Sequence, residues 1–113
     1  MKPVLVLQHI ACETPGIFLD LIREQKRPVE TVRLYKGDRA PDDLSQYSGL
    51  LVMGGPMSVN DEADYPCLKS EDRLLKQALA RDFPTLGICL GSQLVAKAAG
   101  GTIRRGSRKE IGW

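Results

Sequence analysis

The sequence predicts an α/β fold in which helices pack against a mostly parallel sheet. Short continuous apolar runs recur along the chain, and such runs are typical of strands buried on both faces. Segments with helical spacing of apolar residues separate these runs. Strands that alternate with helices in this way indicate parallel pairing, because each helix carries the chain back to the start of the next strand. The 113 residues suffice for one modest core, so we expect residues 1–113 to form a single domain.

The first predicted strand covers residues 4–7, and the second covers residues 29–34. Between them, Thr14-Pro15 predicts the start of a helix, with Thr14 as the N-cap and Pro15 at the first helical position. Pro28 ends this element. The expected apolar stripe of the helix consists of Ile17, Phe18, Leu21 and Ile22.

The second half of the predicted sheet begins after a polar, turn-rich stretch at residues 36–48. We expect at most one helical turn there, at residues 42–46, and then a third buried strand at residues 49–53. A long helix follows at residues 68–81, with its charged residues exposed, and a fourth strand covers residues 85–88. The inward-facing residues expected on that helix are Leu68, Leu75, Ala78 and Leu79.

The charge of the chain argues against a nucleic-acid partner. The net charge is only +2, and the basic run at residues 104–109 has no aromatic residues interleaved with it. We therefore interpret that run as a solvated turn between short extended pieces at residues 102–103 and 111–113. No apolar stretch is long enough to span a bilayer, so we expect no membrane partner.

The three cysteines, Cys12, Cys67 and Cys89, are an odd number at irregular spacing. They indicate reduced thiols in the cytoplasm, and neither a disulfide framework nor a zinc site. The acidic residues at 61–64 lack a second cluster of ligands, so we interpret them as a loop and predict no metal and no cofactor.

The motif Gly87-Ile88-Cys89-Leu90-Gly91 lies between the fourth strand and a helical pattern that Gly100-Gly101 ends. This is the spacing of a nucleophile elbow, with cysteine in place of the serine of esterases. The turn would hold the sulfur of Cys89 at its tip, next to a helix N-terminus that favours negative charge. A Cβ atom at Gly87 or Gly91 would obstruct the close approach of helix and strand.

Gly54-Gly55-Pro56 leaves the third strand at the sheet edge where loops of parallel strands gather. Taken alone this triplet is common turn punctuation, but beside the elbow we interpret it as an oxyanion loop. The amides of Gly55 and Leu90 would then hold a developing oxyanion. Gly54 is a predicted substrate contact. Gln93 lies one helical turn after the cysteine, and its spacing leaves two interpretations open, a substrate contact and an ordinary exposed helical glutamine.

His9 is the only histidine and therefore the only candidate imidazole base for Cys89. It follows the first strand, and strands about 4.8 Å apart would place it far from the sulfur. We expect it to be a loop residue at the substrate edge and not the base.

The elbow residues 87–94, with Gly54-Gly55-Pro56 upstream and residues 109–113 downstream, resemble a class I (triad type) glutamine amidotransferase domain similar to that of GMP synthase. The resemblance implies a flavodoxin-like open sheet with helices on both faces. It also implies that Cys89 attacks the glutamine side-chain amide, that Gly55 and Leu90 hold the oxyanion, and that Gln93 contacts glutamine. The resemblance further implies a domain or subunit that accepts the ammonia, such as a synthetase. Whether the chain forms a homo-oligomer is left open by the sequence.

The family completes its triad with a His-x-Glu motif that this sequence does not contain. We therefore expect residues 1–113 to be the N-terminal part of such a domain, inactive alone, with apolar sheet surface left exposed or covered by a partner chain. Two alternatives stay open. One is a hydrolase of γ-glutamyl peptides on the same fold, and the other is a non-catalytic domain that binds glutamine or regulates a partner.

Overall fold

The computed structural model describes residues 1–108 and contains one four-stranded sheet in the order β2-β1-β3-β4, with all neighbouring strands parallel. The strands are β1 (Val4–Gln8), β2 (Val29–Arg33), β3 (Gly49–Val52) and β4 (Thr85–Gly87). The helices are α1 (Ile17–Glu24), α2 (Cys67–Ala80) and α3 (Leu90–Ala98), with a 3₁₀ turn, η1, at Leu34–Lys36.

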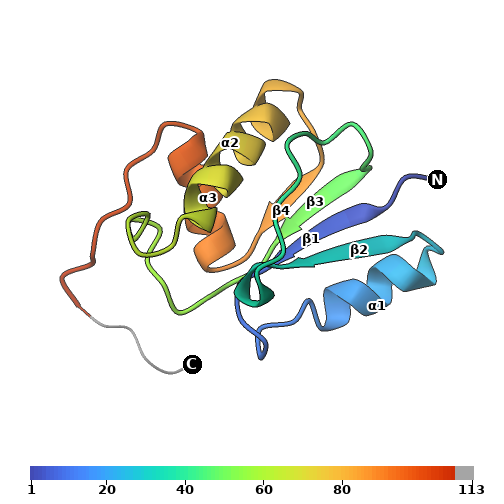
Figure 1. Cartoon of the computed structure of the whole chain (residues 1–113), viewed down its shortest axis with the longest axis horizontal. Coiled ribbons are helices and arrows are strands. Elements are labelled where there is room, and N and C mark those ends of the chain that lie inside the picture. Colours follow the sequence, from blue (N-terminus) through green and yellow to red (C-terminus); the bar gives the residue numbers. More distant parts are fainter. Residues whose placement is uncertain (109–113) are drawn as a thin grey trace.

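Helix α1 lies on one side of the sheet, and α2 and α3 lie together on the other (Figure 1). The strand order corresponds to that of flavodoxin-like doubly wound sheets, in which ligands bind beyond the carboxyl ends of the strands. The predicted fold class is therefore confirmed, and the loops after β1, β3 and β4 leave the sheet along one edge.

The main core fills the space between the sheet and the helix pair α2 and α3. Leu5 pairs with Leu50, and Leu7 pairs with Val52, so that one face of the sheet presents a continuous apolar surface. This surface packs against inward side chains of the two helices, namely Leu68, Leu74, Leu75, Ala78, Leu90 and Leu94. Burial of this surface is the main source of stability and holds α3 in a fixed position above β3.

The opposite face of the sheet is only partly covered. Val6, Leu51 and Met53 form a small buried cluster there, but no residue of α1 is fully buried. A groove of about 390 Å³ runs between α1 and strands β1, β3 and β4, and its walls are almost entirely apolar. Leu86 on β4 is 46% exposed beside this groove, and Leu21 on α1 is 50% exposed. The expectation of exposed apolar sheet surface is confirmed.

The start of α1 differs from the prediction. The helix begins at Ile17, after Gly16, which adopts a φ of 54°. Thr14 is therefore not the N-cap, and Pro15 precedes the helix, where its carbonyl accepts a hydrogen bond from the Phe18 N–H. Pro15 is buried, so the Thr-Pro signal marks a packed turn that directs the chain into the helix.

Residues 42–46 form turns and not the helical turn that we expected. Asp43 accepts hydrogen bonds from the N–H and hydroxyl of Ser45, an arrangement that competes with helix formation. Leu44 is buried in the core and holds the segment down. Residues 102–103 form no strand, and the piece expected at residues 111–113 lies outside the described residues. None of the helices within residues 1–108 is long and apolar enough to cross a membrane.

Candidate active site

The turn that leads from β4 into α3 has the geometry of a nucleophile elbow. Cys89 is the last residue before the helix and has a φ of 53°, a left-handed conformation that is unfavourable for a side-chain-bearing residue. The Ile88 N–H donates to the Val52 carbonyl, and the Gly91 N–H donates to the Ile88 carbonyl. These bonds fix both sides of the strained residue. The Cys89 side chain is exposed at the tip of the turn.

The two glycines of the motif are required by close backbone contacts, as predicted. A Cβ atom at Gly87 would stand 2.6 Å from the Gly91 carbonyl carbon and 2.8 Å from the Ser92 nitrogen. A Cβ atom at Gly91 would stand 2.7 Å from the Val52 carbonyl carbon. Since these neighbours are backbone atoms, neither side chain could be accommodated without moving α3 away from the sheet.

The diglycine loop after β3 lies directly against the elbow. Gly54 is buried, and a Cβ atom built on it would lie 3.3 Å from the Cβ atom of Cys89. The corresponding atom on Gly55 would lie 3.2 Å from a methyl carbon of Leu90. The fold therefore brings together four of the five residues predicted for nucleophile, oxyanion and substrate contacts, namely Gly54, Gly55, Cys89 and Leu90.

The amides predicted for the oxyanion hole have no hydrogen-bond acceptor among the described residues. Within residues 1–108, neither the Gly55 N–H nor the Leu90 N–H donates a hydrogen bond to a protein acceptor. Such amides are available to a ligand oxygen next to Cys89. Gln93 is also exposed, and its own N–H donates to the Cys89 carbonyl in the first turn of α3.

Glu13 is a residue of this site that the sequence analysis did not identify. Its carboxylate oxygen Oε2 would lie 3.3 Å from a Cβ atom on Gly54, against the same glycine as Cys89. Glu13 is exposed and belongs to the loop after β1. No local motif marks this residue, because its position depends on the β1 and β3 loops meeting at the sheet edge.

His9 lies in the loop directly after β1, as expected, and it is buried there. Its side chain is fully buried, and Nε2 lies 2.5 Å from Oε1 of Glu71, whose side chain is also fully buried. Glu71 belongs to α2, so the prediction that the charged residues of this helix are exposed is wrong at this position. The imidazole is occupied by this carboxylate, which agrees with the expectation that His9 is not the base for Cys89.

The histidine still borders the candidate site, because a Cβ atom on Gly55 would lie 3.1 Å from the His9 Cβ. The pair therefore joins α2 to the β1 loop directly behind the diglycine segment. The sequence does carry one signal for it: Glu71 lies three residues after Leu68 and four before Leu75, on the apolar stripe of α2.

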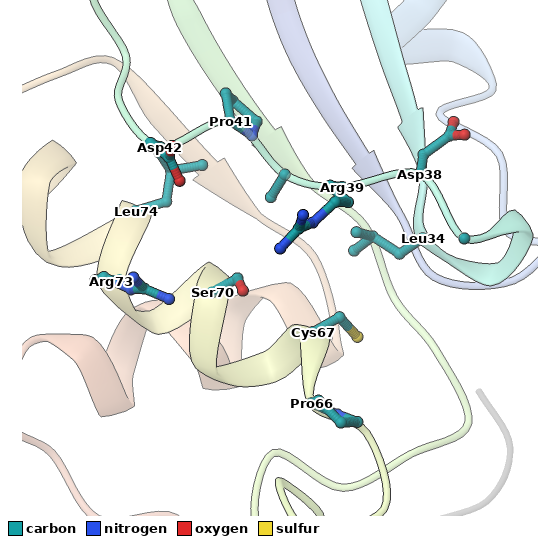
Figure 2. Close-up of a pocket in the computed structure, with 12 residues that line it drawn as sticks. Leu34, Asp38, Arg39, Pro41, Asp42, Pro66, Cys67, Ser70, Arg73 and Leu74 are labelled. Carbon is teal, nitrogen blue, oxygen red and sulfur yellow. The ribbon is translucent and has the colours of Figure 1, made fainter.

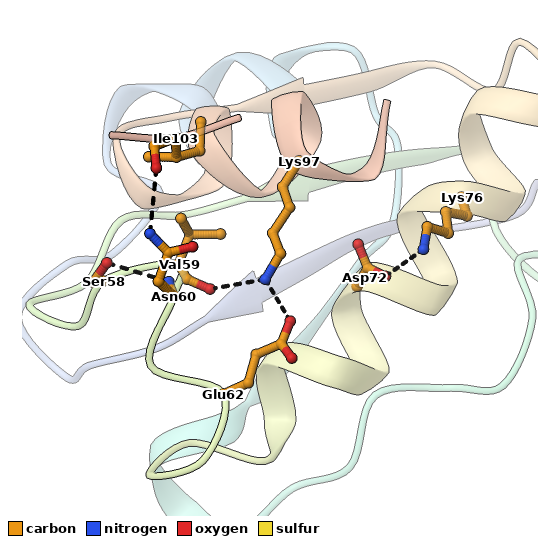
Figure 3. Close-up of polar contacts among 8 residues, drawn as sticks. All are labelled: Ser58, Val59, Asn60, Glu62, Asp72, Lys76, Lys97 and Ile103. Atoms are coloured by element: carbon orange, nitrogen blue, oxygen red, sulfur yellow. Dashed lines mark hydrogen bonds and ion pairs between the residues drawn. The ribbon is translucent and has the colours of Figure 1, made fainter. Parts of the chain in front are cut away.

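The segment that follows the diglycine is tied to α3 and to the chain after it (Figure 3). Lys97 donates to the Val59 carbonyl at 3.4 Å and pairs with Glu62 at 2.5 Å. The Asn60 side-chain amide donates to the Ile103 carbonyl at 3.4 Å. These contacts hold the loop across the helix that carries Cys89.

Comparisons with known proteins agree with this geometry. The sequence profile of the family described as glutamine amidotransferase class-I matches residues 17–113. The glutamine amidotransferase-like protein YfeJ of Salmonella typhimurium is 32% identical over 107 residues, covering 92% of this chain and 45% of YfeJ. A glutamine-hydrolysing GMP synthase subunit of Sulfolobus acidocaldarius is 35% identical over 81 residues, covering 66% of this chain and 37% of the relative.

Solved structures give the same result. The crystal structure of a glutamine amidotransferase from Methylobacillus flagellatus has a TM-score of 0.93 and 41% identity, covering 100% of this chain and 45% of that one. A glutamine amidotransferase from Thermotoga maritima has a TM-score of 0.80 and 36% identity, covering 88% and 43%. This chain thus spans less than half the length of these relatives. With the elbow, the flavodoxin-like sheet and a profile match over most of its length, the chain belongs to the class I glutamine amidotransferase family.

Proposed function

We propose that this chain carries the nucleophile and oxyanion-binding half of a site that hydrolyses the side-chain amide of glutamine. The observation that carries the proposal is the contact between the elbow and the diglycine loop. Cys89 is exposed in a strained turn, and the Gly55 and Leu90 amides beside it have no acceptor within the described residues. This combination suits attack on a carbonyl whose oxygen becomes negative.

In the proposed reaction the Cys89 thiolate attacks the side-chain carbonyl carbon of glutamine. The carbonyl oxygen becomes an oxyanion, which accepts hydrogen bonds from the Gly55 and Leu90 amides. The carbon–nitrogen bond then breaks, the nitrogen takes up a proton and leaves as ammonia, and a γ-glutamyl thioester remains on Cys89. Water hydrolyses this thioester, which releases glutamate and restores the thiol.

The proton transfers in these steps need a general base and acid, and residues 1–108 offer no free imidazole for this role. The single imidazole is buried and paired with the Glu71 carboxylate. The family resemblance implies a histidine and a glutamate from a His-x-Glu motif for this role. We therefore propose that residues 1–113 alone react with glutamine slowly, because members of a triad act as a unit.

The test is covalent labelling with a chloroketone analogue of glutamine, followed by peptide mass spectrometry. Cys89 should be labelled, glutamine should slow the labelling, and Cys89→Ser should abolish it. Cys12 is an internal control, since it is exposed as well. If Cys12 were labelled as fast as Cys89, or if glutamine gave no protection, the proposed site would be refuted.

A pair of glycine variants tests the contribution of the diglycine loop. Gly54→Ala places a methyl group against Cys89, whereas Gly49→Ala meets only ordinary contacts, the nearest at 3.7 Å. We expect Gly54→Ala to slow Cys89 labelling by about tenfold, because small displacements of reacting groups are costly. Gly49→Ala should label like the unmodified protein. Equal rates in both variants would exclude Gly54 as a neighbour of the bound substrate.

A second candidate function is glutamine binding without turnover, in a domain that senses glutamine or regulates a partner. The burial of the only imidazole favours it for these residues taken alone. Calorimetric titration with glutamine separates the two functions when it is combined with labelling of Cys89 by the chloroketone analogue. Heat of binding without any labelling of Cys89 would support the sensing role and reject nucleophilic attack by this cysteine.

The partners of the site are also proposals. The Sulfolobus relative is named as part of a glutamine-hydrolysing GMP synthase, which supports glutamine as the substrate and a synthetase as the consumer of ammonia. We propose that the ammonia passes to such an acceptor, in the same polypeptide or in a separate one, in the cytoplasm.

A further inference from the structure

A second cavity lies away from Cys89, between the loop that follows β2 and the outer face of α2. Its volume is about 840 Å³, within the range of roughly 300–1,000 Å³ that small-molecule sites occupy. One wall is formed by residues 37–42, and the other by the first two turns of α2. Neither wall contains a residue of the candidate active site, so this cavity is a separate feature.

Two arginines from different elements meet in this cavity. Figure 2 shows Arg39 extending from the loop toward α2, where Ser70 and Arg73 face it across the opening. Neither arginine forms an ion pair with a carboxylate within residues 1–108. Ser70 likewise makes no side-chain hydrogen bond within the described part of the chain. Three donor groups therefore line this cavity without acceptors among residues 1–108.

The acidic residues of the same loop do not neutralise these arginines. Asp38 accepts a hydrogen bond from the Arg33 N–H at 3.0 Å, and Figure 2 shows its carboxylate turned away from the guanidinium groups. Asp42 is the one carboxylate of the lining that remains, and it can accept hydrogen bonds from hydroxyl or amino groups of a ligand.

The walls of the cavity are held in place by contacts to the rest of the fold. The Gln77 side chain donates to the Asp42 carbonyl at 2.7 Å, which fastens the loop to α2. Leu74, which lines the cavity, is buried in the main core. The N-terminus of α2 also opens at this cavity, with no acidic residue in its first turn, and its dipole adds positive potential.

We propose that this cavity binds a small phosphorylated molecule, whose phosphoryl oxygens are held by Arg39, Arg73 and Ser70. A phosphoryl group offers three strong acceptor oxygens in a tetrahedral arrangement, which matches donors that approach from two walls. A single carboxylate has two coplanar oxygens, which one guanidinium fork already satisfies. The cavity has room for more than one phosphate, so the ligand carries further groups, and Asp42 faces them.

Cys67 provides a local reporter for this site, because it lines the cavity and is a free cysteine. The experiment measures how pyrophosphate, used as the probe, changes alkylation of Cys67 in the full chain at constant ionic strength. Bound pyrophosphate should slow the alkylation of Cys67, whereas exposed Cys12 should react at an unchanged rate. Pyrophosphate that leaves the Cys67 rate unchanged at millimolar concentration would overturn the proposal.

Charge-removing variants show whether the arginines hold the probe. Arg39→Gln and Arg73→Gln should each weaken pyrophosphate binding by about tenfold, measured by calorimetry. Arg23→Gln on α1 removes the same charge from the opposite side of the sheet and should bind like the unmodified protein. Both cavity arginines are exposed, so their variants should fold. Equal weakening in all three variants would indicate non-specific attraction and would overturn the assignment.

Discussion

Substitution of Gly91 by alanine is the sharpest test of the elbow, because it adds a single carbon atom at its tightest point. The new Cβ would overlap the Val52 carbonyl and stand 2.7 Å from its carbon. That carbonyl cannot move freely, since it also accepts the hydrogen bond from the Ile88 N–H at 3.0 Å. Relief of the overlap must therefore lift α3 or break this bond.

The expected cost follows from opposing contributions. Overpacking against fixed atoms costs about 1–3 kcal/mol, and the upper end applies here because the obstacle is backbone. Loss of the Val52 hydrogen bond adds about 1 kcal/mol. The higher helix propensity of alanine returns about 1 kcal/mol. The net destabilisation of Gly91→Ala is therefore about 3 kcal/mol.

The assay is urea unfolding followed by circular dichroism. With a slope of about 1–3 kcal/mol per molar urea, the midpoint should fall by about 1–3 M. Gly49→Ala is the matched control, because its Cβ would meet only ordinary contacts and its midpoint should stay within error of the unmodified protein. If the two variants unfolded at the same urea concentration, the close approach of α3 to β3 would not exist as described.

Three further predictions concern other parts of the fold. Removal of the buried carboxylate by Glu71→Ala should destabilise the protein by about 3–5 kcal/mol in the same urea assay, because it leaves the imidazole partner buried and unpaired. The exposed control Glu24→Ala should lower the free energy of unfolding by less than about 0.5 kcal/mol. Lys97→Met should lower the free energy of unfolding by less than about 1 kcal/mol, yet it should speed protease cleavage of the loop after β3, which Lys97 holds. The control Lys76→Met also removes an ion pair at the surface and should leave the cleavage rate of that loop unchanged. Burial, and secondarily the nearby Glu71 charge, raises the pKa of the Cys67 thiol. Its alkylation by iodoacetamide should therefore require a higher pH than alkylation of a cysteine in a short peptide. Equal pH profiles for the two thiols would contradict the burial of Cys67.

The sequence was sufficient to predict the features that depend on local sterics. The glycines at 87 and 91 could be assigned because a strand-to-helix turn of that length leaves no space for a side chain. Strands β1 and β3 were predictable because their apolar runs are continuous. The start of α1 was not, because Thr14-Pro15 has the signature of a helix N-terminus while the chain turns once more at Gly16.

The contacts that the sequence did not reveal are those made between distant segments. A glutamate is usually exposed on a helix, so the buried pairing of Glu71 with His9 contradicts the ordinary expectation for both residues. The approach of Glu13 to Gly54 depends on two loops that are 41 positions apart meeting at one edge. Neither contact leaves a periodic or local pattern, and both require the packed tertiary structure to be known.

The partial burial of α1 determines which helix of the molecule unfolds first. With eight residues and none of them fully buried, this helix lacks the packing that stabilises short helices in water, whereas α2 has five buried side chains. Its amide protons should consequently exchange with deuterated solvent through local opening, well before those of α2, whose exchange awaits unfolding of the main core. The two faces of the sheet thus differ in local stability. The side with α2 and α3, which supports the cysteine, is stable, whereas the side with α1 unfolds locally without the rest of the fold.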